Sequence, residues 1–274
     1  MIRLLFALSL VISQPALAQD RTPSHCVALA NADPGFRYVR LASFGDGVPA
    51  ETLRITYLDH ATFLLQTHGG LSVATDYTGY LGTRDFVPTV VTMNNGHDTH
   101  WTSRPDPRIQ HVLKGWPEAG RAADIALDLG EMLIRNVTTD LRGRPTDPEA
   151  QPRANGNSIF VFEVAGLCIG HLAHLHHIPT PGQFATLGRM DVVMAPADGA
   201  FTMDQQAMAE VIARLHSRLI LPMHWFNPET LATFLRGMQA HFPIEFSAAN
   251  SIEVSLQTLP DQPTIVVLSP HWLD

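Results

Sequence analysis

The sequence predicts an α/β fold in which layers of sheet and helix carry histidines at the ends of strands. Two observations support this class. Strand patterns dominate the front of the chain, whereas strands alternate with amphipathic helical segments toward the back. In addition, several predicted strands run directly into histidine, the side chain that most often binds metal ions in proteins.

The front of the chain alternates apolar and polar residues between short turns. Asp59-His60-Ala61 separates the first two strands, and Gly69-Gly70 forms a hairpin turn before the third. The fourth strand is short and buried, and it breaks into a polar loop over 94–100. The predicted strands are 53–58, 62–67, 71–76 and 89–93.

The middle of the chain combines strands with a segment typical of a loop. Residues 119–130 fit either a helical turn or a loop, and both interpretations stay open. Residues 138–157 are rich in proline, glycine and charge, which predicts a long loop with the composition of a flap. The predicted strands are 109–113, 131–137, 159–164 and 167–169, the last two joined at Gly166.

Strands and helices alternate in the back of the chain. Thr180 is placed to cap a helix over 180–188, with Pro181 at its first position. A second helix, 202–216, has apolar residues on one face at 208, 211, 212 and 215. The remaining predictions are a helix at 228–242, strands at 191–196 and 218–225, and edge strands at 252–256 and 264–268.

The first residues have the pattern of a secretory signal. Arg3 precedes an apolar run, and Ala16 and Ala18 form an A-x-A cleavage site. We therefore expect a signal peptide over 1–18, an N-terminal arm over 19–52 and one domain over 53–274, in a protein that is periplasmic or secreted. No other stretch is apolar over the ~20 residues that a membrane span needs. Cys26 and Cys168 are expected to be free thiols, although an oxidising compartment would permit a disulfide.

Charge and composition narrow the class of partner. The formal net charge is -8, and Lys114 is the one lysine, so no basic block exists to neutralise nucleic-acid phosphates. We expect a small-molecule substrate and no nucleic acid; the oligomeric state is left open. The 14 histidines are the compositional anomaly.

Histidines gather after the strand at 167–169. His171, His174, His176 and His177 fall within seven residues, where loop backbone can aim alternate side chains at one point. A single histidine is about as often a solvated or hydrogen-bonded residue as a ligand. Four together, with others at 97, 100 and 224, favour a metal site.

At these residues the chain resembles the metallo-β-lactamase fold superfamily, in the branch of lactonases and N-acyl-phosphatidylethanolamine phospholipase D. The resemblance implies a four-layer αββα sandwich. The similar pieces are ITYLDHATFLLQT (55–67), SVATDY (72–77), the strand and loop at 90–100, HLAH (171–174), DVVMAPADGAFTM (191–203) and LILPMHW (219–225).

The family's H-x-H-x-D-H signature, whose ligands hold two zinc ions, is altered here to MNNGHDTH (93–100). Aligned without a gap, Met93 and Asn95 replace its first two histidines. Shifted by two residues, His97 and His100 survive as ligands. The family's bridging aspartate aligns with His174, and Asp140 lies where the family has a further histidine.

The family's last ligand matches His224. Because other ligand positions are altered, what remains of the family's motif implies one metal site rather than two. Its implied ligands are His97, His100, His174 and His224, with Asp98 and His171 as alternates. The metal is expected to be zinc, with manganese or iron as alternatives.

Four further side chains receive roles from their positions. His60, at a strand tip, is a catalytic candidate as a proton donor, and Asp98 is a second catalytic candidate. Asp76, at a strand end, could orient a ligand imidazole through its other nitrogen, and His171 would support the ligands from behind. His60 and Asp76 also have ordinary interpretations, as a buried histidine bonded to backbone and an aspartate that caps a turn.

Two functions remain open from the sequence. One is an exported metal-dependent hydrolase with an altered, mononuclear centre that acts on an ester, a lactone or a phosphoester. The alternative is a degenerate family member that binds metal or a small ligand without catalysis. The lost ligands support the alternative, and the density of remaining histidines supports the hydrolase.

Overall fold

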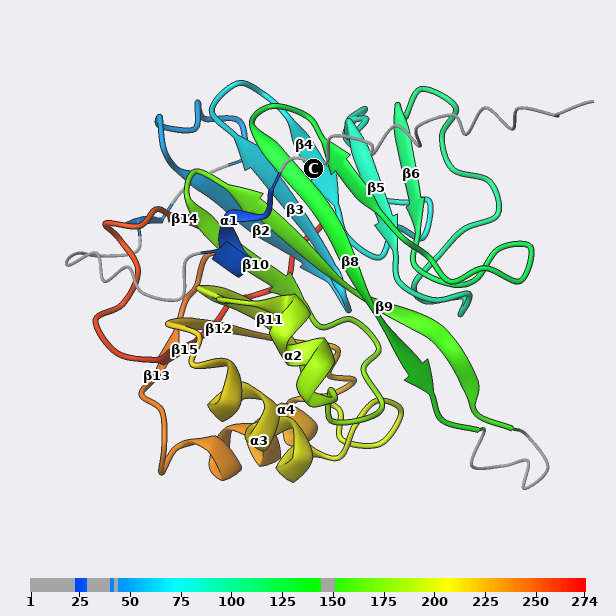
Figure 1. Cartoon of the computed structure of the whole chain (residues 1–274). Coiled ribbons are helices and arrows are strands. Elements are labelled where there is room, and N and C mark those ends of the chain that lie inside the picture. The colour runs from blue at the N-terminus through cyan, green and yellow to red at the C-terminus, as the bar shows by residue number, and fades with distance from the viewer. Residues whose placement is uncertain (1–22, 29–39, 42–43, 144–150) are drawn as a thin grey trace, which may run out of the picture.

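Two β-sheets pack face to face in the computed structural model, which describes residues 23–28, 40–41, 44–143 and 151–274 (Figure 1). Within these residues the first sheet has seven strands in the order β1-β14-β2-β3-β4-β5-β6. Their bounds are β1 (Arg40–Leu41), β2 (Leu53–Asp59), β3 (Thr62–Thr67), β4 (Ser72–Ala74), β5 (Val90–Met93), β6 (His111–Lys114) and β14 (Ser251–Val254).

The second sheet has eight described strands in the order β13-β15-β12-β11-β10-β9-β8-β7. Parallel pairing joins β10, β11, β12, β15 and β13, so these strands end at the same edge. The bounds are β7 (Ala126–Asp128), β8 (Met132–Leu141), β9 (Arg153–Val164), β10 (Leu167–His171), β11 (Val192–Pro196), β12 (Leu219–Met223), β13 (Ile244–Phe246) and β15 (Thr264–Val267).

The core follows the alternation of side chains along each strand. Ile55 and Tyr57 of β2 and Phe160 and Phe162 of β9 point into the space between the sheets, where they form one apolar cluster. Ile159, the neighbour of Phe160, points to the other face and packs in a second cluster with the helices. The continuous apolar run at 159–162 predicted a buried strand, and its residues are buried on both faces.

Helices cover the outer face of the second sheet: α2 (Pro181–Leu187), α3 (Gln205–Leu215) and α4 (Pro228–Met238) (Figure 1). On the outer face of the first sheet, irregular segments take the place of helices in the part of the chain that the structure describes. Tyr77, Leu81, Ile109 and Leu273 of these segments form an apolar cluster with outward side chains of the strands. The layered α/β fold expected from the sequence is confirmed.

Local signals predicted most elements well. Thr180 accepts from the amide of Gln183, and the Gln183 side chain accepts from the Thr180 amide, which makes a capping box at the start of α2. The four apolar positions predicted for α3 are its buried residues, Met208, Val211, Ile212 and Leu215. The loop interpretation of 119–130 holds, except that β7 forms within it.

The predicted long loop over 138–157 is wrong at both ends, because β8 and β9 continue as a hairpin through the pair Leu141 and Arg153. Asn157 donates to Thr139 Oγ1 at 2.8 Å, and Thr138 donates to Asn155 Oδ1 at 2.8 Å. Such cross-strand pairs stabilise a polar hairpin that composition alone assigns to a loop. Residues 144–150, at its tip, lie outside the described residues.

The predicted edge positions of the last two strands are also wrong. β14 lies between β1 and β2, and β15 lies between β12 and β13. Neither β1 nor β13 was predicted, because two or three residues carry too little periodicity to be recognised. Among the described residues no helix combines the length and apolar character needed to cross a membrane.

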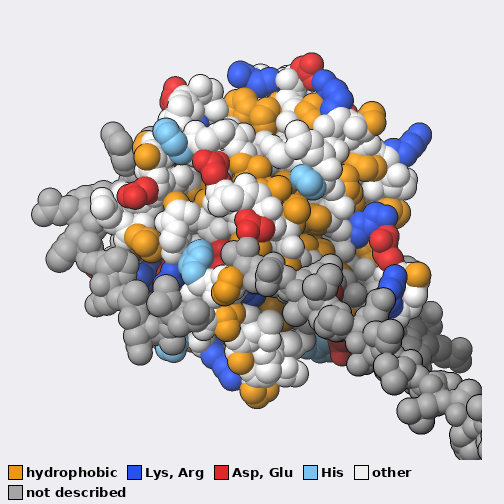
Figure 2. Space-filling view, turned by 45° about the horizontal axis from the view of Figure 1, so that its top comes forward, with side chains coloured by type: hydrophobic (Ala, Val, Ile, Leu, Met, Phe, Trp, Pro, Cys, Tyr) orange, Lys and Arg blue, Asp and Glu red, His pale blue; other side chains and the backbone are white. Residues whose placement is uncertain are grey.

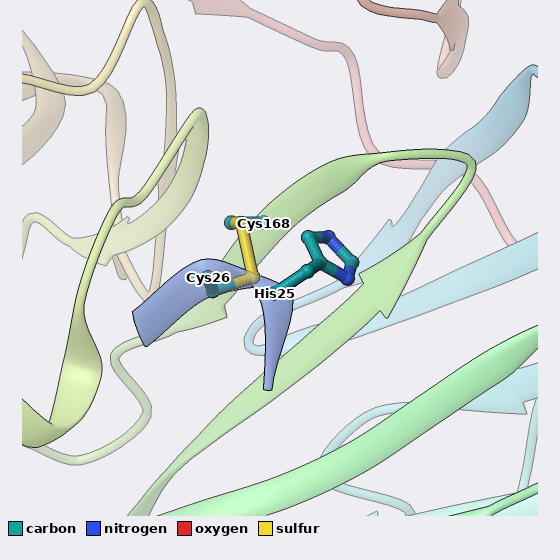
Figure 3. Close-up of side chains that lie close together, drawn as sticks. All are labelled: His25, Cys26 and Cys168. Atoms are coloured by element: carbon teal, nitrogen blue, oxygen red, sulfur yellow. A yellow bond between two sulfur atoms is a disulfide. The ribbon is translucent and has the colours of Figure 1, made fainter. Parts of the chain in front are cut away.

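A disulfide joins Cys26 of α1 (His25–Ala28) to Cys168 of β10, so the expectation of two free thiols is wrong (Figure 3). The two cysteines are 142 residues apart in sequence, and only the packing of α1 on β10 brings their Cα atoms to 5.8 Å. Glu163 holds the same segment by accepting from Ser24 Oγ at 2.5 Å and the His25 amide at 2.9 Å. The described part of the N-terminal arm is thus attached to the domain, whereas residues 1–18 lie outside the described residues.

Candidate metal centre

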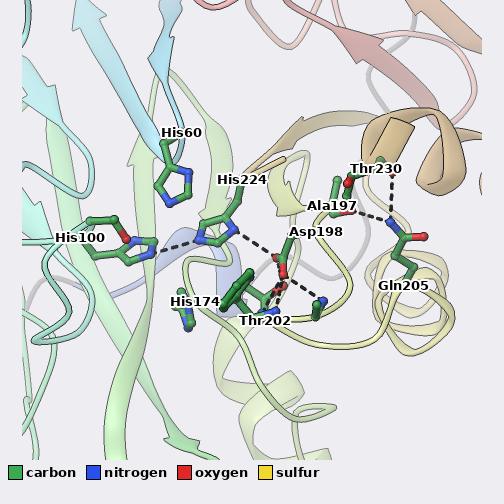
Figure 4. Close-up of polar contacts among 12 residues, drawn as sticks. His60, His100, His174, Ala197, Asp198, Thr202, Gln205, His224 and Thr230 are labelled. Atoms are coloured by element: carbon green, nitrogen blue, oxygen red, sulfur yellow. Dashed lines mark hydrogen bonds and ion pairs between the residues drawn. The ribbon is translucent and has the colours of Figure 1, made fainter. Parts of the chain in front are cut away.

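Three imidazoles from separate strand ends converge at one edge of the sheets. His60 lies at the turn between β2 and β3, His100 follows β5, and His224 follows β12. One nitrogen of each ring lies within 4.8 Å of a nitrogen of the others, and Nε2 of His100 is 3.2 Å from Nε2 of His224. Figure 4 shows the three rings turned toward one another.

The backbone at this edge holds the side chains in place. His60 and His224 have positive φ values of 45° and 58°, and Asp76, at the end of β4, has 44°. Positive φ is uncommon for residues other than glycine and occurs often at functional sites. The amide of His224 also donates to the His60 carbonyl at 2.7 Å, and the Tyr57 hydroxyl donates to the same oxygen at 2.8 Å.

A buried carboxylate lies behind each of two imidazoles. Asp76 contacts Nδ1 of His100 at 2.7 Å, and Asp198 contacts Nδ1 of His224 at 3.1 Å. A carboxylate accepts, so each Nδ1 carries the hydrogen and each Nε2 keeps its lone pair. This is the arrangement that orients histidine ligands in metal sites.

Asp76 was selected from the sequence for an orienting role, and its contact with His100 suits that role. It is fully buried and also accepts from the backbone amide of Asn94 at 3.1 Å and from the Asn94 side chain. Burial raises the pKa of Asp76 to about 7, while His171 and the Asn94 amide act in the opposite direction. The ionisation of this carboxyl group therefore depends on these neighbours.

Asp198, which follows β11, was missed in the sequence. It accepts from the amides of Ala200, Phe201 and Thr202 at 3.0, 2.6 and 3.0 Å and from the Thr202 hydroxyl. Burial by itself raises the pKa of Asp198, but the hydrogen bonds from His224 and Thr202 outweigh it and hold the pKa below its usual value. The available signal was its place just after a buried strand, in APADG.

Two of the three imidazoles, His60 and His100, are kept neutral. Burial, and then the neighbouring His224 and His100 rings, lower the pKa of His60 to about 3. Burial also lowers the pKa of His100 well below its usual value. Neutral imidazole is the form that binds metal ions, so His60 and His100 are in their ligating state at neutral pH.

The three imidazoles suit one divalent metal ion. Two nitrogens bound to a tetrahedral zinc ion at about 2.0–2.1 Å lie about 3.3–3.4 Å apart, close to the 3.2 Å between His100 and His224. Both of these Nε2 atoms hold lone pairs, so the short approach is favourable when a cation lies between them. Nε2 of His60 is buried and has no hydrogen-bond partner among the described residues. It is therefore available as the third ligand.

The other ligands expected from the sequence lie around this cluster. The His174 ring centroid is 4.8 Å from that of His100 and 5.1 Å from that of His224, and its Nδ1 is 2.8 Å from His176 Nε2. His97 is exposed at the rim, with its ring 5.8 Å from His174. Thus His97, His100, His174 and His224 do come together, and His60 joins them.

Asp98 and His171 are not among the three clustered imidazoles. Asp98 is exposed, and its side chain makes no hydrogen bond or ion pair with any described residue. His171 is fully buried, and its Nε2 lies 2.9 Å from the Ala61 carbonyl oxygen. Met93, at a family ligand position, packs in the outer apolar cluster of the first sheet.

The fold and the strand-end site agree with comparisons to known proteins. A family model described as Beta-lactamase superfamily domain matches residues 54–224, more than half of the chain and the whole span from His60 to His224. The chain belongs to this superfamily. A relative from Anaeromyxobacter dehalogenans, named as a UPF0173 metal-dependent hydrolase, is 24% identical over 222 residues, which cover 67% of this chain and 81% of the relative.

Two solved structures share the fold. A protein of Thermotoga maritima, named as a candidate Zn-dependent hydrolase of the metallo-β-lactamase superfamily, superposes with a TM-score of 0.57 at 23% identity and covers 79% of this chain and 98% of its own. A candidate metal-dependent hydrolase of Parabacteroides distasonis gives a TM-score of 0.51 at 15% identity, over 74% of this chain and 94% of its own. At these identities the likeness concerns the fold.

Proposed function

We propose that this protein is a hydrolase that depends on one divalent metal ion held by His60, His100 and His224. The observation that carries the proposal is the pair of Nε2 atoms facing each other at 3.2 Å, each on a ring whose Nδ1 is held by a buried carboxylate. Three imidazoles, two of them oriented by carboxylates, would bind the metal ion and leave its fourth coordination position open to water or substrate.

Zinc is the proposed metal, with manganese or iron as alternatives. Zinc held by three protein ligands lowers the pKa of a bound water to about 7 and polarises carbonyl and phosphoryl oxygens. Within the chain, Asp76 and Asp198 keep His100 and His224 oriented, and the shared backbone hydrogen bond keeps His60 beside His224. His60 then binds metal, in place of the proton-donor role that the sequence suggested.

The rim of the centre favours a substrate with an apolar group. The Phe226 ring is 5.4 Å from the rings of His60 and His224, and Phe201 lies edge-on to it at 5.1 Å. Both phenylalanines are exposed, at 54% and 63%. Exposed aromatic groups beside a site bind apolar surface. Of the candidate substrates, an ester or lactone with an apolar group therefore fits better than a phosphoester.

The relatives support the reaction class. The Anaeromyxobacter relative is named as a metal-dependent hydrolase, and the Thermotoga protein is named for zinc. The specific branch of lactonases and N-acyl-phosphatidylethanolamine phospholipase D stays a prediction. A small molecule is the proposed substrate. The face seen in Figure 2 supports this, because its acidic and basic side chains are interspersed and form no basic patch.

We further propose that the protein is exported to the periplasm or secreted, after cleavage of residues 1–18. The signal pattern motivates this location, and the Cys26–Cys168 disulfide suits an oxidising compartment. Intact mass of protein from the periplasm tests it, with a chain that begins at or near Gln19 expected.

Metal analysis combined with hydrolysis assays tests the function. Purified protein should contain about one zinc per chain and hydrolyse 4-nitrophenyl hexanoate or an alkyl lactone, and it should lose this activity after dialysis against a chelator and regain it with zinc. Bound zinc without hydrolysis of any ester, lactone or phosphoester would favour the alternative of a non-catalytic binding protein. Absence of bound metal after zinc addition would refute the hydrolase and leave the alternative of a protein that binds a small ligand.

A further inference from the structure

A chain of hydrogen bonds fixes the hydrogen positions on His176 and His174. The backbone amide of Arg142 donates to Nδ1 of His176 at 2.9 Å. An amide can only donate, so Nδ1 of His176 carries no hydrogen. Because the imidazolium form carries hydrogens on both nitrogens, His176 is neutral and has its one hydrogen on Nε2.

The same reasoning passes from His176 to His174. Nε2 of His176 lies 2.8 Å from Nδ1 of His174. Since Nε2 of His176 is the donor, Nδ1 of His174 is the acceptor and carries no hydrogen. His174 therefore carries its hydrogen on Nε2, the nitrogen that makes no hydrogen bond with any described residue.

The tautomer of His174 is the reverse of the tautomer of His100 and His224. Behind those two rings a carboxylate accepts from Nδ1, which leaves a lone pair on Nε2. Behind His174 another imidazole donates to Nδ1, which leaves an N–H group on Nε2. A ring of the first kind is ready to bind a metal ion, and a ring of the second kind is ready to donate a hydrogen bond.

The ring of His174 lies beside the metal centre. Its ring lies 4.8 Å from His100 and 5.1 Å from His224, between centroids, and the side chain is 8% exposed. Arg142, whose amide begins this series of hydrogen bonds, is also held in place, because its guanidinium donates to the carbonyl oxygens of Ala200 and Phe201. These residues belong to the loop that wraps Asp198.

We propose that His174 is not a metal ligand but a neutral N–H donor, which the Arg142 amide orients through His176 and which binds the substrate oxygen that gains negative charge during hydrolysis. This role rests on the proposed function. A preorganised donor at such an oxygen is among the strongest catalytic contributions. His174 is then the catalytic residue, and His176 is a positioning residue.

Nitrogen NMR of ¹⁵N-histidine-labelled protein tests the tautomers without any assay of activity. We expect His174 and His176 to carry hydrogen on Nε2 in the zinc-free protein. We also expect His174 to keep that hydrogen when zinc is added, while His60, His100 and His224 show metal-bound shifts. A hydrogen on Nδ1 of His174, or loss of its Nε2 hydrogen on zinc addition, would overturn the proposal.

Variants of the two histidines separate a donor from a ligand. His174→Leu should keep about one zinc per chain and lower kcat by about 100-fold, the usual cost of losing one such donor. His176→Gln keeps an acceptor for the Arg142 amide and a donor for His174, so its kcat should stay closer to wild type than that of His176→Leu. His177→Leu, at an exposed neighbour, is the matched control.

The possible results of these experiments distinguish failure of the donor role of His174 from failure of the proposed hydrolase function. Loss of zinc from His174→Leu would show a ligand and overturn the donor role. Equal kcat for wild type and His174→Leu would do the same. If the wild-type protein hydrolyses nothing, the proposed function fails, and the catalytic role of His174 fails with it, whereas the NMR result still decides between donor and ligand.

Discussion

The backbone amide of His224 donates a 2.7 Å hydrogen bond to the carbonyl oxygen of His60. This bond joins the end of β12 in the second sheet to the turn between β2 and β3 in the first. Both residues have positive φ, so each backbone turns sharply where its imidazole enters the site. The centre is therefore built on the junction of the two sheets, and its geometry depends on their packing.

Removal of a proposed ligand should abolish tight zinc binding. His60→Ala, His100→Ala and His224→Ala should each weaken affinity by more than the ~10–100-fold that loss of an outer hydrogen-bond partner costs. Zinc content after dialysis is the measurement. His97→Ala is the control, because that side chain is exposed at the rim. Retention of zinc by His60→Ala together with its loss from His97→Ala would restore the ligand set inferred from the family motif.

Asp198→Asn should lower zinc affinity about 10–100-fold, because the amide no longer provides the charge that orients His224. Zinc titration with a competing chelator measures this change. Asp98→Asn, on an exposed residue close in sequence to His100, should leave affinity unchanged. A large effect of Asp98→Asn on zinc affinity would instead support Asp98 as a metal ligand, the alternate role that the sequence suggested for it.

Loss of the disulfide should destabilise the folded chain. Cys26→Ala or Cys168→Ala should lower the free energy of unfolding by about 2–5 kcal/mol, since the crosslink constrains a long segment of the unfolded chain. Urea titration measures this change. The double variant should match the single variants, because either change breaks the same bond. Two free thiols in the untreated wild-type protein would contradict this account.

Stability should depend on pH through Glu163. Burial alone raises the pKa of this carboxyl group, but hydrogen bonds from Arg135 and Ser24 outweigh burial and lower the pKa below its usual value of 4.5. Its stabilisation is thus complete above pH 4.5 and is lost as the pH falls through the folded-state pKa.

Glu163→Gln tests this dependence by urea titration over a range of pH. The variant should be about 3 kcal/mol less stable at neutral pH, because Arg135 loses its buried partner but keeps two carbonyl acceptors. The difference from wild type should shrink in acid. Glu118→Gln is the control, since its pair with Lys114 is exposed. A difference that stays constant down to acid pH would argue against the lowered pKa.

The aromatic rim should decide preference among esters. Phe201→Ala and Phe226→Ala should each raise KM for 4-nitrophenyl hexanoate about fivefold, which corresponds to loss of one aromatic contact, and leave the acetate ester little changed. Phe246→Ala is the matched control, because Phe246 is 73% exposed on the edge strand β13. If Phe201→Ala and Phe226→Ala have the same KM as wild type for both esters, the acyl group binds away from these two phenylalanines.

The sequence by itself determined the local elements and the class of fold. Apolar alternation predicted β2, β3 and β9, and the caps of α2 were readable because Thr180 and Gln183 lie within one turn. The same local signals located histidines at strand ends. These features depend on neighbours a few residues apart, whose geometry the backbone of a helix or strand sets directly.

Only the tertiary structure decided which groups form the site and in what state. Asp198 and His224 meet because β11 and β12 run parallel, and His60 meets His224 because the sheets pack on each other. Cys26 reaches Cys168 for the same kind of reason. The tautomer of His174 depends on an amide 32 residues away, through His176. Such contacts arise when packing brings distant segments together, and no local pattern in the chain encodes the partner that each side chain will find.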